Sequence, residues 1–147
     1  PGAMLLGGLT GGALGAAFGL GLQPGRGTVA FANSGAFWGY SAGAILANLR
    51  RGSDDGRATL AALTSLGGAC ALGAVSHSYG LSRTDAALTD MIATGTTLLG
   101  LLFGSMEGEE AAVTLATVGM ATGLLTGTII AISRTPASGT RLSTSPW

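Results

Sequence analysis

The sequence predicts an all-α protein of five closely packed helices that cross a membrane. Three observations lead to this prediction: five long apolar stretches, glycines repeated at four-residue spacing, and charges confined to the boundaries between the stretches. Each stretch has about 20 residues, the length that a helix needs to cross a hydrocarbon layer of about 30 Å. Strands usually have only about five or six residues, so helices are preferred despite the high glycine content.

The apolar stretches are separated by short polar clusters. In chain order they cover residues 3–22, 28–49, 57–79, 84–106 and 111–132. Residues 1–134 are predicted to form one membrane bundle, and residues 135–147 a polar C-terminal tail. The triplet Ser82-Arg83-Thr84 recurs as Ser133-Arg134-Thr135, which suggests a bundle built from repeated helical hairpins.

The charges support these boundaries independently. Acidic residues lie at the starts of the last three stretches: Asp54, Asp55, Asp85, Glu107, Glu109 and Glu110. Arginines lie at the ends of the second and fifth stretches: Arg50, Arg51 and Arg134. The helix macrodipole favours anions at N-termini and cations at C-termini, so this order is the one expected for helices. Ser82 and Asp85 also have the spacing of a capping box.

The strongest pattern is a set of glycine ladders. They are Gly7, Gly11, Gly15 and Gly19; Gly35, Gly39 and Gly43; Gly100 and Gly104; and Gly119, Gly123 and Gly127. Four-residue spacing puts the glycines of a ladder on one helix face, where a second backbone can approach closely. Each interior glycine costs about 1 kcal/mol relative to alanine in water, so the ladders favour a bilayer. They either hold one chain together or also join several copies.

The composition excludes several classes of protein. The chain has 27 glycines in 147 residues, 10% charged residues and a net charge of zero. All the basic residues are arginines and are balanced by acids, which argues against nucleic acid as a partner. The lone Cys70 excludes a disulfide scaffold. A composition rich in Gly, Ala and Arg, without Lys, is typical of a GC-rich bacterial genome, so we expect a bacterial membrane protein.

Few residues suggest chemistry. His77 is the only histidine, and Asp90 is the one acid inside an apolar stretch, so the two could line a polar path. We expect no metal and no other cofactor, because Cys70 and His77 supply at most two ligands from one helix. Without lysine no Walker sequence exists, and no Gly-x-Ser-x-Gly elbow occurs, so we expect no enzyme. The aromatic cluster Phe37, Trp38 and Tyr40 is expected to fill packing space opposite a glycine ladder.

These observations favour a structural membrane protein. In its glycine ladders the chain resembles several families of small multi-pass proteins, among them the mitochondrial inner-membrane protein translocases; the resemblance implies no residue roles. The first hypothesis is a scaffold or an oligomeric assembly subunit, with membrane lipid and either further copies or a larger membrane complex as partners. A pore or transport component with a polar path near Asp90 and His77 is the second. A soluble helical interaction domain cut from a longer protein is the third.

Overall fold

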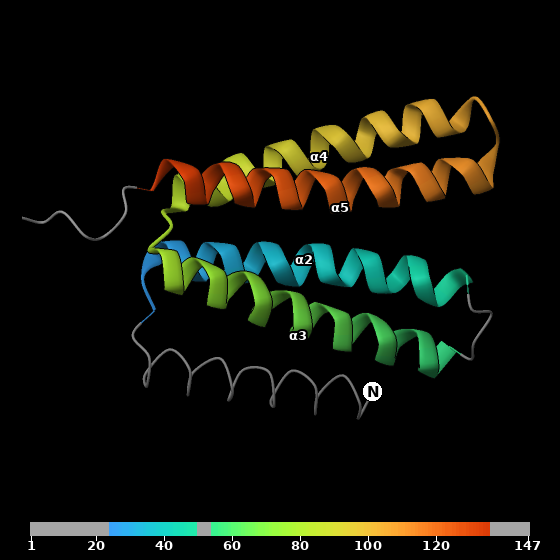
Figure 1. The fold of residues 1–147 in the computed structure, drawn as a ribbon. Helices are drawn as coiled ribbons and strands as arrows, with labels where there is room; N and C mark the ends of the chain where they lie inside the picture. The colour runs from blue at the N-terminus through green and yellow to red at the C-terminus, as the bar shows by residue number, and fades with distance from the viewer. Residues whose placement is uncertain (1–23, 50–53, 136–147) are drawn as a thin grey trace, which may run out of the picture.

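The structure, a computed structural model, describes residues 24–49 and 54–135, which form four α-helices (Figure 1). They are α2 (Arg26–Leu49), α3 (Asp54–Tyr79), α4 (Arg83–Ser105) and α5 (Glu109–Arg134). The predicted all-α class is confirmed for this part of the chain. The described residues form four helices and not the five predicted for the whole chain. The first predicted stretch, with Gly7, Gly11, Gly15 and Gly19, lies outside the described residues, as does the tail beyond residue 135.

The helices begin where the charge pattern predicts. α3 and α5 each have two acidic residues in the first turn, namely Asp54 and Asp55, and Glu109 and Glu110. At the start of α4, the Ser82 hydroxyl accepts from the backbone N–H of Asp85 at 3.2 Å. The Asp85 carboxylate in turn accepts from the backbone N–H of Ser82 at 2.9 Å, so the predicted capping box is confirmed.

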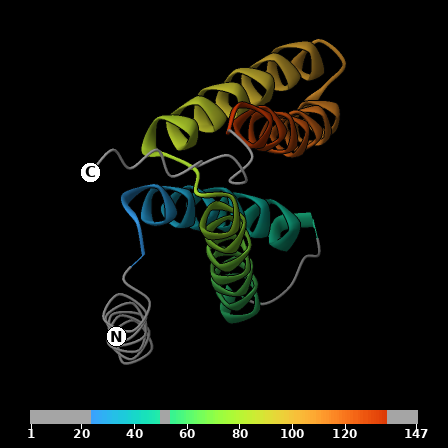
Figure 2. The same cartoon turned by 60° about the vertical axis from the view of Figure 1, so that its left-hand side comes forward.

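The helices form two antiparallel hairpins, α2–α3 and α4–α5, which face each other through α2 (Figures 1 and 2). Gly80 has a φ of 64° and ends α3, while the N–H of Leu81 donates to the Ser76 carbonyl at 3.1 Å. The hairpins meet where Phe31 of α2 packs with Leu81, Ala86 and Ala131. This cluster joins the start of α2 and the start of α4 to the end of α5.

The two serine-arginine-threonine triplets differ in their local structure. Ser82 caps the start of α4, whereas Ser133 lies in the last turn of α5 and donates its hydroxyl hydrogen to the Ile130 carbonyl at 2.9 Å. The described helices form two hairpins, as predicted, and each triplet lies at or just after the end of a hairpin's second helix, but the local settings of the two serines differ. A three-residue match carries too little packing information to define a structural repeat.

Three of the described helices, α3, α4 and α5, are long and apolar enough to cross a membrane. Among the described residues, α2 has a similar length but does not reach the same hydropathy. Its polar residues Asn33, Ser34, Tyr40 and Ser41 lower its hydropathy. α2 is also the helix that contacts all three others, and its buried Ser34 donates to Asp90 of α4.

Candidate functional site between and within the hairpins

Hairpin α2–α3 is formed by direct approach of two helix backbones. Three predicted ladder glycines of α2 lie at this contact: Gly35, Gly39 and Gly43. A Cβ atom added to Gly35 would overlap the carbonyl of Gly68, and one added to Gly43 would lie 2.7 Å from the Cα of Ala61. Any side chain at these positions would therefore push α3 away from α2.

Hairpin α4–α5 is built in the same way. The other five ladder glycines of the described residues lie at its contact: Gly100, Gly104, Gly119, Gly123 and Gly127. A Cβ atom on Gly123 would lie 2.6 Å from the Cα of Ala93, and one on Gly127 would lie 2.7 Å from the Cα of Thr89. All eight described ladder glycines thus lie against the neighbouring helix of their own hairpin.

One contact pattern occurs in both hairpins. Gly39 lies against the carbonyl of Thr64, and Gly119 lies against the carbonyl of Thr96. In each hairpin the glycine four residues later meets the alanine three residues before the threonine. Both threonine hydroxyls donate to a carbonyl one turn earlier at 2.9 Å, and that of Thr96 also contacts the Gly119 carbonyl at 2.7 Å. The glycines stand on the first helix of one hairpin and on the second helix of the other.

Asp90 of α4 connects the two hairpins. Its Oδ1 atom accepts from the indole N–H of Trp38 at 2.9 Å and from the hydroxyl of Ser34. Both donors belong to α2, stand one turn apart and are buried. Trp38 also packs against Ala93 and Met120, which belong to α4 and α5. Asp90, the acid predicted to lie inside an apolar stretch, therefore links hairpin α4–α5 to hairpin α2–α3 by accepting these two hydrogen bonds.

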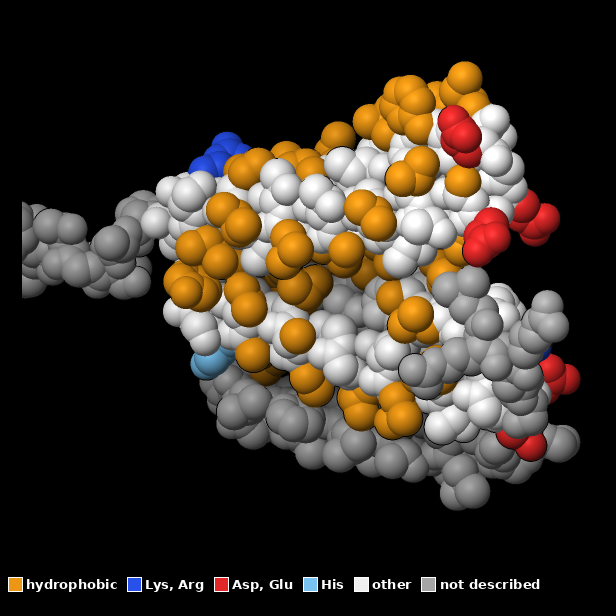
Figure 3. All heavy atoms as spheres, turned by 45° about the vertical axis from the view of Figure 1, so that its right-hand side comes forward, with side chains coloured by type: hydrophobic (Ala, Val, Ile, Leu, Met, Phe, Trp, Pro, Cys, Tyr) orange, Lys and Arg blue, Asp and Glu red, His pale blue; other side chains and the backbone are white. Residues whose placement is uncertain are grey.

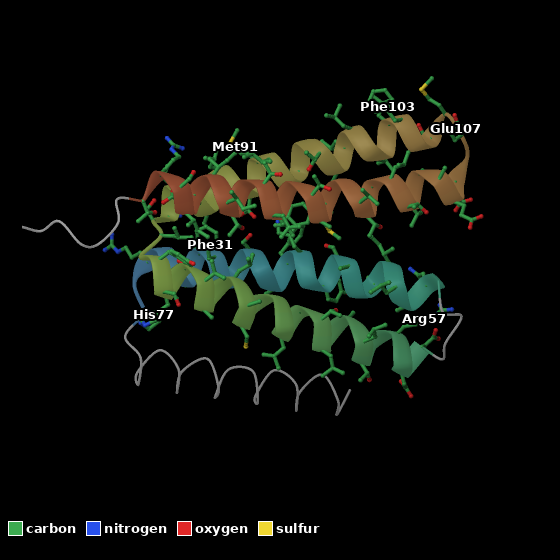
Figure 4. All side chains as sticks on the ribbon, in the orientation of Figure 1. Phe31, Arg57, His77, Met91, Phe103 and Glu107 are labelled. Atoms are coloured by element: carbon green, nitrogen blue, oxygen red, sulfur yellow. The ribbon has the colours of Figure 1, made fainter. Side chains whose placement is uncertain are left out.

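The other predicted polar residue, His77, is exposed in the last turn of α3. Its side chain points away from α4 and α5 (Figure 4). The hydrogen bonds of the described residues join Asp90 to Ser34 and Trp38 and do not join it to His77. The structure thus does not bring the two residues of the predicted polar path together.

The aromatic cluster of α2 divides between inside and outside. Trp38 is buried, whereas Phe37 is 62% and Tyr40 58% exposed. The expectation that all three fill packing space is therefore wrong for Phe37 and Tyr40. Consecutive helical residues point in different directions, so only part of such a cluster can face one neighbour. The Phe37 ring makes an edge-to-face contact with Trp38, with a centroid separation of 5.1 Å.

These features define a class of protein: an all-α chain of long apolar hairpins, each packed through glycine, alanine and threonine. The part of the chain that the structure describes contains no group of three His, Cys, Asp or Glu side chains placed to hold a metal ion. Comparison of the sequence and the structure with protein-family models, curated proteins and solved structures gives no match.

Proposed function

We propose that this chain is a structural membrane protein whose hairpins act as a preassembled helical unit within the bilayer. The observation that carries the proposal is the placement of large and small apolar side chains. Of the ten apolar residues that are buried in the described part of the chain, six are alanines: Ala47, Ala61, Ala86, Ala93, Ala112 and Ala131. In water-soluble proteins leucine, isoleucine, valine and phenylalanine are, like alanine, among the residues most often fully buried, whereas the described core contains one leucine, one phenylalanine and no isoleucine or valine.

Most of the large apolar side chains of α4 and α5 lie on the outside. On α4, Met91 is 73%, Leu102 60% and Phe103 60% exposed, and on α5 Leu125 is 65% and Ile129 64% exposed. Hydrophobic side chains are spread over the hairpin surfaces (Figure 3). Leaving so many of them in water would forgo about 1.5–3 kcal/mol for each side chain, whereas lipid tails solvate them well.

The polar side chains described here also serve packing. Asp90 bonds to α2, and the hydroxyls of four threonines donate to carbonyls of their own helices: Thr96 and Thr97 of α4, and Thr114 and Thr117 of α5. Ser and Thr use this route in membrane helices. The proposed role is therefore assembly rather than catalysis. The described ladder glycines already contact the neighbouring helix of their own hairpin. Self-association of several copies would therefore use the outward faces of the helices.

Fractionation of cells that express the whole chain tests the proposal. We expect the protein to stay in the membrane pellet after alkaline carbonate washing and to be released only by detergent. A mass measurement on the extracted species then distinguishes a single copy from an oligomeric unit. Release into the supernatant without detergent would contradict the membrane proposal and favour a soluble helical interaction domain.

A further inference from the structure

We propose that the end of the bundle carrying Arg26, Arg83 and Arg134 binds the anionic phospholipid headgroups of one leaflet and thereby orients the protein. The proposal rests on the membrane location argued above. It adds an interaction surface and a partner of defined charge, namely the lipid phosphate group. We call this surface the arginine end.

The fold brings the arginine end together from three helices. Arg26 begins α2, Arg83 begins α4 and Arg134 ends α5. The contacts of Phe31 with Leu81, Ala86 and Ala131 hold these three helix ends side by side. In Figure 1 they lie at the left of the bundle, opposite the start of α3 and the turn between α4 and α5.

The opposite end carries the carboxylates. They are Asp54 and Asp55 in the first turn of α3, Glu107 in the α4–α5 turn, and Glu109 and Glu110 in the first turn of α5. Figure 3 shows the acidic side chains at this end, with a small basic patch beside them, and a larger basic patch at the other end. Among the described residues the cation here is Arg57, and it lies 3.8 Å from an Asp54 oxygen. We call this surface the carboxylate end.

The arginines of the arginine end are available to a ligand. All three are exposed, and the described residues contain no ion pair that involves them. The acid at this end, Asp85, attracts Arg134, but its carboxylate already accepts from the backbone N–H of Ser82 at 2.9 Å and from its hydroxyl at 2.6 Å. The arginine end thus carries three guanidinium groups and one carboxylate, whose Oδ2 atom already accepts two hydrogen bonds, and a guanidinium fork matches the geometry of a phosphate.

Charge complementarity selects the partner. A leaflet rich in anionic lipid attracts arginines held near its surface and repels carboxylates held there. Arginine in short connections also sets the orientation of membrane proteins. Counting arginines in the sequence alone separates the two sides poorly, since Arg50, Arg51 and Arg57 fall on the side opposite the other four. Five carboxylates share that side; they contribute little to orientation by the arginine rule, but they offset the positive charge there and repel anionic headgroups.

The test uses the full chain in vesicles made either of equal parts of phosphatidylglycerol and phosphatidylcholine or of phosphatidylcholine alone. Native mass spectrometry after extraction counts the lipids that stay bound. We expect phosphatidylglycerol to be retained about tenfold over phosphatidylcholine, and the variant with both Arg83→Gln and Arg134→Gln to lose this preference. Arg57→Gln, at the carboxylate end, is the matched control and should keep it.

Orientation in cells provides a second readout. In a Cys70→Ala background, a cysteine replaces exposed Ser78 at the arginine end or exposed Ser105 at the carboxylate end. An impermeant maleimide should label S105C in spheroplasts and S78C only in inverted vesicles. Equal retention of the two lipids overturns this inference alone. So does labelling that shows the protein with all its native arginines inserted in both orientations. Recovery of the chain outside the vesicles overturns the proposed function instead.

Discussion

Replacing Gly68 with alanine is expected to open hairpin α2–α3, whereas replacing its neighbour Gly67 is expected to be tolerated. A Cβ atom on Gly68 would overlap the Gly35 carbonyl and lie 2.9 Å from its carbon, and it would lie 3.3 Å from the Cα of Gly39. These are backbone atoms, which cannot turn aside as a flexible side chain can. Gly67 has no atom within 4 Å of the corresponding position.

The expected loss for Gly68→Ala is about 3 kcal/mol of the free energy of unfolding, the range found when a packed core is overfilled. Gly67→Ala is expected to leave stability unchanged or raise it by up to about 1 kcal/mol, because alanine is the better helix former. Denaturant titration of the protein in mixed micelles measures both values. Equal losses for the two variants would show that helix propensity, and not close approach of the backbones, explains the glycines.

Replacing Asp90 with alanine is expected to weaken the junction of the two hairpins. The change removes the acceptor of the Trp38 indole N–H and of the Ser34 hydroxyl, and both donors are buried. A buried donor without a partner costs about 1–3 kcal/mol, so we expect a loss of about 2–5 kcal/mol. Asp90→Asn keeps a side-chain oxygen in place and should cost about 1 kcal/mol.

The fluorescence of Trp38 gives this prediction a local readout. The chain has two tryptophans, so Trp147→Phe leaves Trp38 as the sole indole. Asp90→Ala should shift the emission of Trp38 and lower the midpoint of unfolding. The control Asp55→Ala removes an exposed acid in the first turn of α3, so it should leave the emission unchanged and lower the midpoint only slightly. An Asp90→Ala protein with wild-type emission and midpoint would mean that this contact does not hold the hairpins together.

The helices and their ends were predictable because they depend on local chemistry. Apolar length, first-turn acids and the Ser82–Asp85 spacing each act within one or two turns, and the four described helices begin and end within a few residues of the predicted stretches. The faces on which the ladder glycines lie also follow from helical spacing alone. Which helix each ladder meets depends instead on the order of the hairpins in space.

The contact of Asp90 was not predictable in that way. Its donors lie 56 and 52 residues earlier in the chain, and nothing in the spacing links α2 to the first turns of α4. The available signal was Ser34 and Trp38 one turn apart on one face of the second stretch, with a single acid inside another stretch. Exposed His77 shows the converse limit, because its place near a helix end does not specify the direction in which it points.

The placement of large apolar side chains toward lipid is tested most directly by spin labels. In the Cys70→Ala background, labels replace exposed Leu98 in the middle of α4, exposed Leu125 in the middle of α5, or exposed Glu107 in the α4–α5 turn. In reconstituted vesicles, oxygen should relax the labels at 98 and 125 more strongly than a water-soluble nickel chelate does, and the label at 107 should show the reverse. Labels at 98 and 125 that are as accessible to the nickel chelate as the label at 107 would place these faces in water and contradict the membrane account.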